Sequence, residues 1–467
     1  MEKLTSSIKK LINDTLGYDV FNEIGPKHIL EPRGKFRNFA KVVLKPKSTG
    51  DVSLLLSILN KEKIGIVPYA GGTGLVGGQM ASNDDHLLLS LEKMNKFRED
   101  ITSEGILTVE AGIILSDLQQ KAKDKNRVFP LALASQGSCQ IGGNLATNAG
   151  GLNVIRFGNV RDLCLGLEVV MADGTIFHGL KSLYKDNTGY DIKNLMIGSE
   201  GTLGVITAAT LKTFPIYDET IVSMIKIKSP ENAIKLLYIF KSVLGESVQA
   251  FELISKQGLE HLELGKFKFV DPFLPRANWN ILTEVSASSN LNVRNAFENI
   301  LSDAIEKNII EDAVLADNEI KMRSLWSIRE NIPEANRRIG AIASTDISVP
   351  ISKIPSFISA TDSKLKELFP YLQINCFGHL GDGNLHYNIF PPKGKNRNEF
   401  SDIQKDVVTI IHTEAHKLGG SFSAEHGVGR LKVLDLKRYG DPGKLVLMRA
   451  IKHALDPNGI LNPGAII

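Results

Sequence analysis

The chain has 467 residues, of which 43% are hydrophobic and 23% are charged, so it can form two or three domains with complete cores. Lys and Arg number 55 against 52 Asp and Glu, and this near balance argues against nucleic acid or an anionic membrane as the main partner. Three widely spaced cysteines argue against a disulfide framework and favour a reducing compartment. The N-terminus lacks the apolar run of a secretory signal, and no run could span a bilayer, which predicts a cytoplasmic protein without a transmembrane segment.

The first half of the chain alternates between helix and strand patterns. Residues 4–16 have the apolar spacing of an amphipathic helix. A second helix is predicted at residues 48–63, where Ser48 and Asp51 are spaced as in a capping box, and a third at residues 114–126. Strands are predicted at residues 39–46, 64–70, 84–94 and 105–113.

The next segments are rich in glycine. Residues 134–151 contain too many glycines for a regular element and predict an ordered loop. Residues 164–180 predict a hairpin that turns at Ala172-Asp173-Gly174. Residues 194–215 predict a strand, a glycine loop and another strand. From about residue 217 the pattern is that of an α+β domain, an antiparallel sheet with packed helices.

The stretch "PYAGGTGLVGGQM", residues 68–80, contains a literal G-x-G-x-x-G at Gly72, Gly74 and Gly77. A nicotinamide-binding Rossmann unit would require a helix of ten or more residues between this loop and the next strand. Only "GGQMASNDD" lies there, and its glycines, Asn and Asp residues break helices. The sequence therefore excludes a Rossmann unit.

Successive glycines can also turn backbone N–H groups inward around a pyrophosphate. Taken alone, the loop at residues 68–80 could equally be a turn without a ligand. Three further loops of small residues, "GSCQIGGN", "TNAGG" and "GSEGTLG", occur in the same 150 residues. Convergence of these loops on one extended ligand is a more economical explanation than four empty turns.

Two polar, glycine-flanked segments near the C-terminus contain His379, His386 and Glu425. Two imidazoles and a carboxylate can bind a divalent metal such as Zn²⁺. A spacing of seven would put the two histidines on opposite faces of a regular strand, but a bend at Gly381 and Gly383 can bring them together. From spacing alone, a structural role for the histidines remains the alternative.

Six motifs occur in order along the chain, "PYAGGTGLVGG", "GSCQIGGNLATNAGG", "LGLEVVMADGT", "KDNTGYDIKNLMIGSEGTLGVIT", "FGHLGDGNLHYN" and "SAEHGVG", and the match that they mark extends over roughly residues 30–467. Together they resemble the FAD-dependent D-2-hydroxyacid dehydrogenases of the p-cresol methylhydroxylase / vanillyl-alcohol oxidase superfamily, and are most similar to D-2-hydroxyglutarate dehydrogenases. The resemblance implies an α+β fold. A two-subdomain FAD-binding domain at residues 1–216 would precede an antiparallel substrate (cap) domain at residues 217–467, whose last 45 or so residues would pack back on the flavin domain.

The resemblance also implies which residues bind FAD. The first loop, residues 70–75, would hold the pyrophosphate. Residues within 138–151 would line the phosphates and the isoalloxazine, and residues within 200–206 would lie at the adenine end or the ring edge. Family members with covalent flavin often have a histidine where this chain has Thr73, which predicts a dissociable cofactor. The cofactor-binding residues carried over are Ala70, Gly71, Gly72, Thr73, Gly74, Leu75, Ser138, Gly142, Gly143, Asn148, Gly151, Glu200, Gly204 and Ile206.

The implied reaction transfers the Cα hydride of a D-2-hydroxyacid to flavin N5 while the hydroxyl proton leaves. In the relatives the positions of His379, His386 and Glu425 bind the metal, which would acidify the hydroxyl. His426 would be the general base, with orientation of a neighbour as its alternative role.

Two further residues would bind the substrate carboxylate. Arg329 would pair with it, and Asn388 would donate a hydrogen bond to it. Alternatively, Arg329 would be an exposed arginine on a helix, and Asn388 would only form hydrogen bonds in a turn or between strands.

One position departs from the family pattern. Ser344 and Thr345 stand where relatives commonly have Lys followed by an aromatic residue or His, which weakens the assignment of a dicarboxylic substrate unless Lys353 or another group compensates. D-lactate and glycolate therefore remain alternative substrates. A metal-dependent hydrolase and a nucleotide-binding module are the alternatives from other classes. The implied electron acceptor is an electron-transfer flavoprotein or a quinone, and a homodimer is left open.

Overall fold

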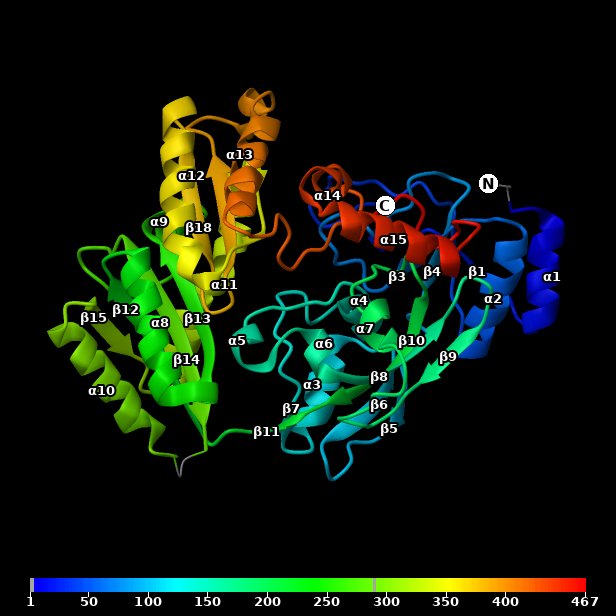
Figure 1. The fold of residues 1–467 in the computed structure, drawn as a ribbon, viewed down its shortest axis with the longest axis horizontal. Coiled ribbons are helices and arrows are strands. Elements are labelled where there is room, and N and C mark those ends of the chain that lie inside the picture. Colours follow the sequence, from blue (N-terminus) through cyan, green and yellow to red (C-terminus); the bar gives the residue numbers. More distant parts are fainter. Residues whose placement is uncertain (1–3, 289–290) are drawn as a thin grey trace. The chain divides into compact units, whose positions relative to one another are not determined.

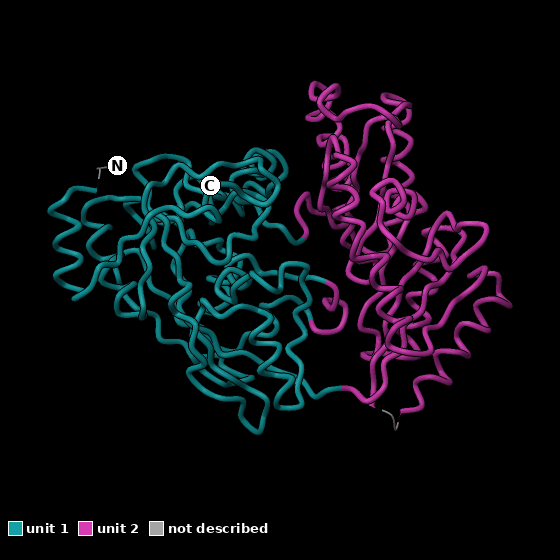
Figure 2. The backbone as a smooth tube through the Cα atoms, turned by 180° about the vertical axis from the view of Figure 1, so that it is seen from behind, with its two compact units in different colours: residues 1–151, 158–216, 425–467 teal, residues 152–157, 217–424 magenta. Residues whose placement is uncertain are grey.

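The computed structural model describes residues 4–288 and 291–467. It divides into two compact units, shown in Figure 2. Unit 1 comprises Met1–Gly151, Gly158–Ile216 and Glu425–Ile467, and unit 2 comprises Leu152–Phe157 and Tyr217–Ala424. Nothing in the sequence pattern indicates that residues 152–157 join unit 2. None of the helices in the described part of the chain combines the length and the apolar run that crossing a membrane requires.

Unit 1 contains a four-stranded sheet in the order β1 (Phe21–Glu23), β2 (Val42–Leu44), β4 (Leu87–Ser90), β3 (Ile66–Tyr69). Its helices are α1 (Ser6–Leu16) and α2 (Thr49–Lys61), and α2 begins at Ser48, whose side chain accepts from Asp51 N, as predicted. β3 and β4 are parallel, yet the described residues 70–86 between them form no helix. The exclusion of a Rossmann unit is confirmed.

The second sheet of unit 1 has five strands, and it confirms the predicted hairpin, because β8 pairs antiparallel with β9. The strand order is β5 (Phe97–Glu99), β6 (Ile106–Glu110), β10 (Val205–Lys212), β8 (Cys164–Val170), β9 (Ile176–Gly179). A two-stranded ribbon joins β7 (Arg127–Val128) to β11 (Phe214–Pro215). The remaining helices of unit 1 are α3 (Leu115–Lys123), α4 (Ile141–Ala146), α6 (Val160–Leu163), α7 (Ile192–Met196), α14 (Val433–Tyr439) and α15 (Pro442–Leu455).

Two local predictions are wrong. The glycine-rich segment 134–151 is not all loop, because α4 lies within it. Gly142 is needed there for close packing, since a Cβ at this position would lie only 2.7 Å from the Cβ of Ala111. The start of segment 194–215 is helical rather than extended, because Asp191 caps α7 by accepting a hydrogen bond from Asn194 N.

Unit 2 is built on an eight-stranded sheet whose strand pairs are antiparallel, as the sequence pattern predicts (Figure 1). The order is β15 (Ile310–Leu315), β12 (Glu219–Ile227), β14 (Trp279–Ala287), β13 (Val248–Ser255), β18 (Gln373–His379), β19 (Asn384–Phe390), β16 (Ala343–Ser344), with β17 (Ile347–Ser348) also pairing β19. The short helix α5 (Val154–Phe157) contacts β13.

Helices cover the two faces of this sheet. α8 (Pro230–Leu244), α10 (Val293–Glu306), α12 (Ile354–Leu368) and α13 (Gln404–Lys417) share a core with one face. α9 (Lys256–Leu264) and α11 (Glu319–Ile339) pack on the other face, where Leu259, Leu325 and Ile328 join the cluster that contains Phe377. Because side chains alternate along a strand, Phe251 and Leu253 of β13 enter the first core, and Glu252 between them points to the face with α9 and α11.

Candidate functional site

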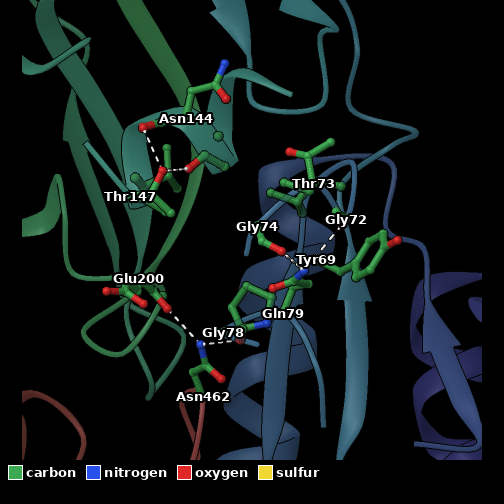
Figure 3. A pocket seen from close by; sticks show the side chains of 18 of the residues that line it. Tyr69, Gly72, Thr73, Gly74, Gly78, Gln79, Asn144, Thr147, Glu200 and Asn462 are labelled. Atoms are coloured by element: carbon green, nitrogen blue, oxygen red, sulfur yellow. Dashed lines mark hydrogen bonds between the residues drawn. The ribbon is translucent and has the colours of Figure 1, made fainter. Parts of the chain in front are cut away.

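Unit 1 contains a pocket with about 860 Å³ of empty space, part of it open to solvent. Figure 3 shows the glycine loop after β3 on one side of it and α4 on the other. The lining consists of Leu91, His426, Asn462 and some of the residues in each of the segments 68–79, 142–147 and 200–206. The structure thus brings residues of all four small-residue segments to one cavity.

Most of the predicted cofactor-binding residues line this pocket, namely Ala70, Gly72, Thr73, Gly74, Gly142, Gly143, Glu200, Gly204 and Ile206. Gly71, Leu75, Ser138, Asn148 and Gly151 do not belong to the lining. Gly71 instead packs on backbone, since a Cβ there would lie 2.4 Å from the carbonyl oxygen of Ser138. Sequence reasoning missed Tyr69, Gln79 and Asn462, which also line the pocket.

The first glycine loop presents unpaired backbone donors. The Gln79 side chain donates from Nε2 to the carbonyls of Gly72 (3.3 Å) and Gly74 (2.7 Å), which fixes the loop, as Figure 3 shows. Within the described residues, the N–H groups of residues 71–75 donate to no protein acceptor. Such a run of free amides in a left-handed glycine turn is an anion-binding concavity, so the loop fits a pyrophosphate.

The C-terminal segment of unit 1 ties two of the loops together. The Glu200 carboxylate accepts hydrogen bonds from Val428 N (2.7 Å) and Gly429 N (2.8 Å). Arg430 donates to the carbonyls of Gly77 and Gly78, and Asn462 donates to those of Gly78 and Glu200.

Burial shifts the pKa values of the two charged groups in these contacts, Glu200 and Arg430. Burial raises the pKa of the Glu200 carboxyl, although the two N–H donors oppose the shift, and burial lowers the pKa of Arg430 to about 10. A single signal in the sequence, an arginine directly after the glycine-flanked segment "HGVG", could have drawn attention to Arg430.

His426 lies in the lining of the same pocket, and its Nε2 is 3.4 Å from Glu425 Oε1. The proposed base therefore stands beside the space that fits the cofactor. Glu425 is the first residue of the C-terminal segment of unit 1 and follows Ala424, the last residue of unit 2, directly along the chain.

In unit 2, His379 and His386 lie on the same face of the sheet, at the end of β18 and within β19. A ring nitrogen of one lies within 4.8 Å of a ring nitrogen of the other, and the ring centroids are 5.7 Å apart. The connecting turn is tight at Gly383, whose φ of +90° favours glycine and whose Cβ would lie 2.4 Å from the Val349 carbonyl oxygen. The expectation that a glycine bend brings the histidines together is confirmed.

Behind His379 lies a buried carboxylate. Glu252, 1% exposed, accepts from His379 Nδ1 at 2.7 Å through Oε1 and from Arg329 Nε at 2.8 Å through Oε2. Burial alone would raise the pKa of Glu252, but its contacts with His379 and Arg329 outweigh this effect and hold the pKa at about 2. Glu252 was not among the predicted site residues, although a carboxylate between Phe251 and Leu253 in an apolar strand is a visible signal.

Arg329 is not an exposed helix arginine. It lies on α11, is 5% exposed, and its guanidinium carbon lies 4.8 Å from the centroid of the Phe377 ring. Its Nε is bound to Glu252, whereas neither Nη group donates to any residue in the described part of the chain. The two Nη groups are therefore free to form a fork toward a carboxylate ligand.

Asn388 lies on the same face of β19 as His386, and its backbone pairs with Ser344 of β16. It is buried, and its Oδ1 has no hydrogen-bond partner among the described residues. The Thr345 hydroxyl already has a hydrogen-bond partner, because it donates to the Tyr387 carbonyl at 2.6 Å. Ser344 and Lys353 are exposed.

The chain matches two protein-family models, the FAD binding domain over residues 40–179 and the C-terminal domain of FAD linked oxidases over residues 218–466. It is 37% identical to a probable mitochondrial D-2-hydroxyglutarate dehydrogenase of Oryza sativa subsp. indica, over 93% of this chain and 76% of the relative. It is 35% identical to a putative mitochondrial D-lactate dehydrogenase of Schizosaccharomyces pombe, over 96% of this chain and 85% of the relative. A solved structure of p-cresol methylhydroxylase with substrate bound shares the fold, with a TM-score of 0.75 at 16% identity, over 98% of this chain and 96% of that one.

Proposed function

The chain belongs to the family of FAD-linked oxidases, and we propose that it oxidises a D-2-hydroxyacid to the 2-oxoacid, with D-2-hydroxyglutarate as the favoured substrate. The observation that carries the proposal is the pair of free Nη groups of Arg329 on the sheet face that also holds His379 and His386. A 2-hydroxyacid carries a carboxylate and a hydroxyl on adjacent carbons, and these two groups suit a site that has an arginine cation next to two imidazoles. D-lactate is the second candidate, favoured by the relative from Schizosaccharomyces pombe.

FAD is the cofactor of the proposed reaction, and the pocket in unit 1 fits it. The free amides of residues 71–75 would hold the pyrophosphate, and Gly142 and Gly143, which line the pocket, would lie against the ring system. When bound, FAD supplies the acceptor for the hydride that leaves the substrate Cα. Thr73 lies in the lining where covalent relatives have a histidine, so the cofactor is dissociable.

A divalent metal, zinc in the first instance, completes the proposal, with His379, His386 and Glu425 as its ligands. The support lies within unit 2, in the two neighbouring imidazoles and the carboxylate behind His379, since metal-binding histidines almost always donate their second N–H to such a group. A bound metal supplies a Lewis acid that lowers the pKa of the substrate hydroxyl.

Side chains of the protein itself would transfer the proton and bind the substrate carboxylate. His426 accepts the hydroxyl proton, Arg329 forks onto the substrate carboxylate, and Asn388 donates a hydrogen bond to it from Nδ2. A metal-dependent hydrolase or a nucleotide-binding module without redox chemistry has no support once the chain is an FAD-linked oxidase. The electron acceptor, an electron-transfer flavoprotein or a quinone, and the cytoplasmic location are parts of the proposal, and several relatives are named mitochondrial.

The substrate test compares D-2-hydroxyglutarate, D-lactate, D-malate and glycolate. We expect the purified yellow protein to bleach anaerobically with D-2-hydroxyglutarate and to show the highest kcat/KM for it with an artificial dye. A higher kcat/KM for D-lactate would replace the favoured substrate by the second candidate. A colourless protein, or one that none of the four acids bleaches, would refute the proposed reaction.

A substitution of Ser344 tests whether this edge of the sheet contacts the distal carboxylate of the substrate. In Ser344→Lys we expect kcat/KM for D-2-hydroxyglutarate relative to D-lactate to rise about tenfold, because a charged hydrogen bond to a carboxylate contributes about 1.5–3 kcal/mol, reduced here by exposure. Ser242→Lys is the control, since Ser242 is also exposed but lies on α8, which packs on the other face of the sheet. An unchanged ratio in Ser344→Lys would mean that this position does not contact the substrate.

A further inference from the structure

We infer that Glu252 is a positioning residue, one carboxylate that fixes both the metal-binding tautomer of His379 and the direction of the Arg329 fork. The inference rests on the proposed function and adds to it a residue that contacts neither substrate nor cofactor. Its basis is geometric, because the two oxygens of Glu252 are divided between the two side chains, Oε1 at 2.7 Å from His379 Nδ1 and Oε2 at 2.8 Å from Arg329 Nε.

The protonation pattern follows from the donor inventory. An ionised carboxylate can only accept hydrogen bonds, so Nδ1 of His379 must carry the proton in this contact. In the neutral imidazole the lone pair then lies on Nε2, which is the atom that would bind a metal. Glu252 therefore selects the one neutral tautomer of His379 that can bind a cation through Nε2.

The second oxygen acts on Arg329. By accepting from Nε, Glu252 holds the plane of the guanidinium over the Phe377 ring and leaves both Nη groups for a ligand. Residues 252 and 379 are directly opposite each other in the β13–β18 register, so the strand pairing itself sets the distance between carboxylate and imidazole. The proposed metal ligand His379 and the proposed substrate-binding Arg329 are thus both held by one residue of β13.

A neighbouring carboxylate provides a matched control. Glu284 lies on β14, and it accepts hydrogen bonds from Trp326 Nε1 at 2.7 Å and from Gln249 Nε2 at 2.9 Å. Trp326 and Arg329 are three residues apart on α11, so each carboxylate anchors the same helix to the sheet. Glu284 pairs with these two side chains rather than with a histidine, so it shares the structural role of Glu252 but not the positioning role.

The decisive variant is Glu252→Gln, which is isosteric but offers one acceptor and one donor group. The amide must either face a donor of Arg329 or His379 with its own N–H₂, or donate to Nδ1 and move the imidazole proton to Nε2. If the amide donates to Nδ1, the proton on Nε2 blocks metal binding there. If the amide oxygen accepts from Nδ1 instead, the N–H₂ group opposes Arg329 Nε, and His379 loses the carboxylate charge that makes it a stronger ligand. We expect the Zn²⁺ affinity of the FAD-loaded protein, measured by competition with a chromophoric chelator, to fall about 10–100-fold.

Two further readouts separate positioning from stability. In Glu252→Gln we expect KM for D-2-hydroxyglutarate to rise while FAD content stays at the wild-type level, and in Glu284→Gln we expect Zn²⁺ affinity and KM to be unchanged. If Glu252→Gln does not fold, Glu252→Asp keeps two acceptors on a shorter arm, and we expect it to weaken Zn²⁺ binding by a smaller factor.

The outcomes distinguish the inference from the function on which it rests. Wild-type Zn²⁺ affinity in the folded Gln or Asp variant, or an equal loss in Glu284→Gln, would overturn the positioning role and leave the proposed metal site standing. A wild-type protein that oxidises D-2-hydroxyglutarate but binds no Zn²⁺ would overturn the metal site and the inference with it.

Discussion

Replacing His379 with alanine should remove the bound metal and lower kcat/KM for the D-2-hydroxyacid about a thousandfold, with FAD retained. The size follows from the several kcal/mol that a Lewis acid contributes to the transition state, at about 1.4 kcal/mol per factor of ten in rate. FAD should remain, because the pocket that fits it is lined only by residues of unit 1 and His379 belongs to unit 2. Metal analysis and flavin absorbance of the same sample check both expectations.

His416→Ala is the control for this substitution. His416 is an exposed histidine on α13, also in unit 2, and its removal should leave metal content and turnover unchanged. Full activity in His379→Ala would remove the metal from the mechanism. Loss of FAD together with the metal would show instead that the substitution disturbs the fold.

Replacing Gly143 with valine should give a colourless protein. A Cβ on Gly143 would lie 3.0 Å from Ala70 Cβ and 3.1 Å from the Ala70 carbonyl oxygen, so a branched side chain must displace the first glycine loop or enter the pocket. Overpacking of this kind costs about 1–3 kcal/mol, and if the pocket bears the cost, FAD binds about tenfold to a hundredfold more weakly. Flavin absorbance after gel filtration and a fluorescence titration with added FAD measure the loss.

Gly137→Ala is the matched glycine control. An added Cβ there has no neighbour within 4 Å and the backbone does not require glycine, so FAD affinity should stay at the wild-type level. A yellow Gly143→Val protein with wild-type affinity would mean that α4 does not line the cofactor site. Circular dichroism of both variants identifies a loss of fold.

Local patterns were sufficient for most elements. Ser48 with Asp51 predicted the start of α2, and the Ala172-Asp173-Gly174 turn predicted the β8–β9 hairpin, because capping and turn geometry depend on residues that are near neighbours in sequence. The absence of a helix after the first glycine loop was also readable, since it required only a count of residues and their helix propensities.

Packing decided the two segments where local pattern failed. Glycine at 142 and 143 signals a loop by propensity, yet in the structure both lie in α4, where the missing side chains let the helix approach Ala111 and Ala70. The apolar run at the start of segment 194–215 was too short to distinguish a helix from a strand, and Asp191 made it a helix.

The pocket-lining loops, His379 and His386 could be predicted from the sequence, because glycine loops and a histidine pair are defined by residue type and spacing, and the family resemblance added Arg329. The tertiary structure alone decided which groups orient them. Glu252 is 127 positions from His379 and 77 from Arg329, and the carboxylate reaches both only because β13 pairs with β18 and α11 packs on that face. Long-range strand pairing sets such contacts, and no local pattern encodes the register.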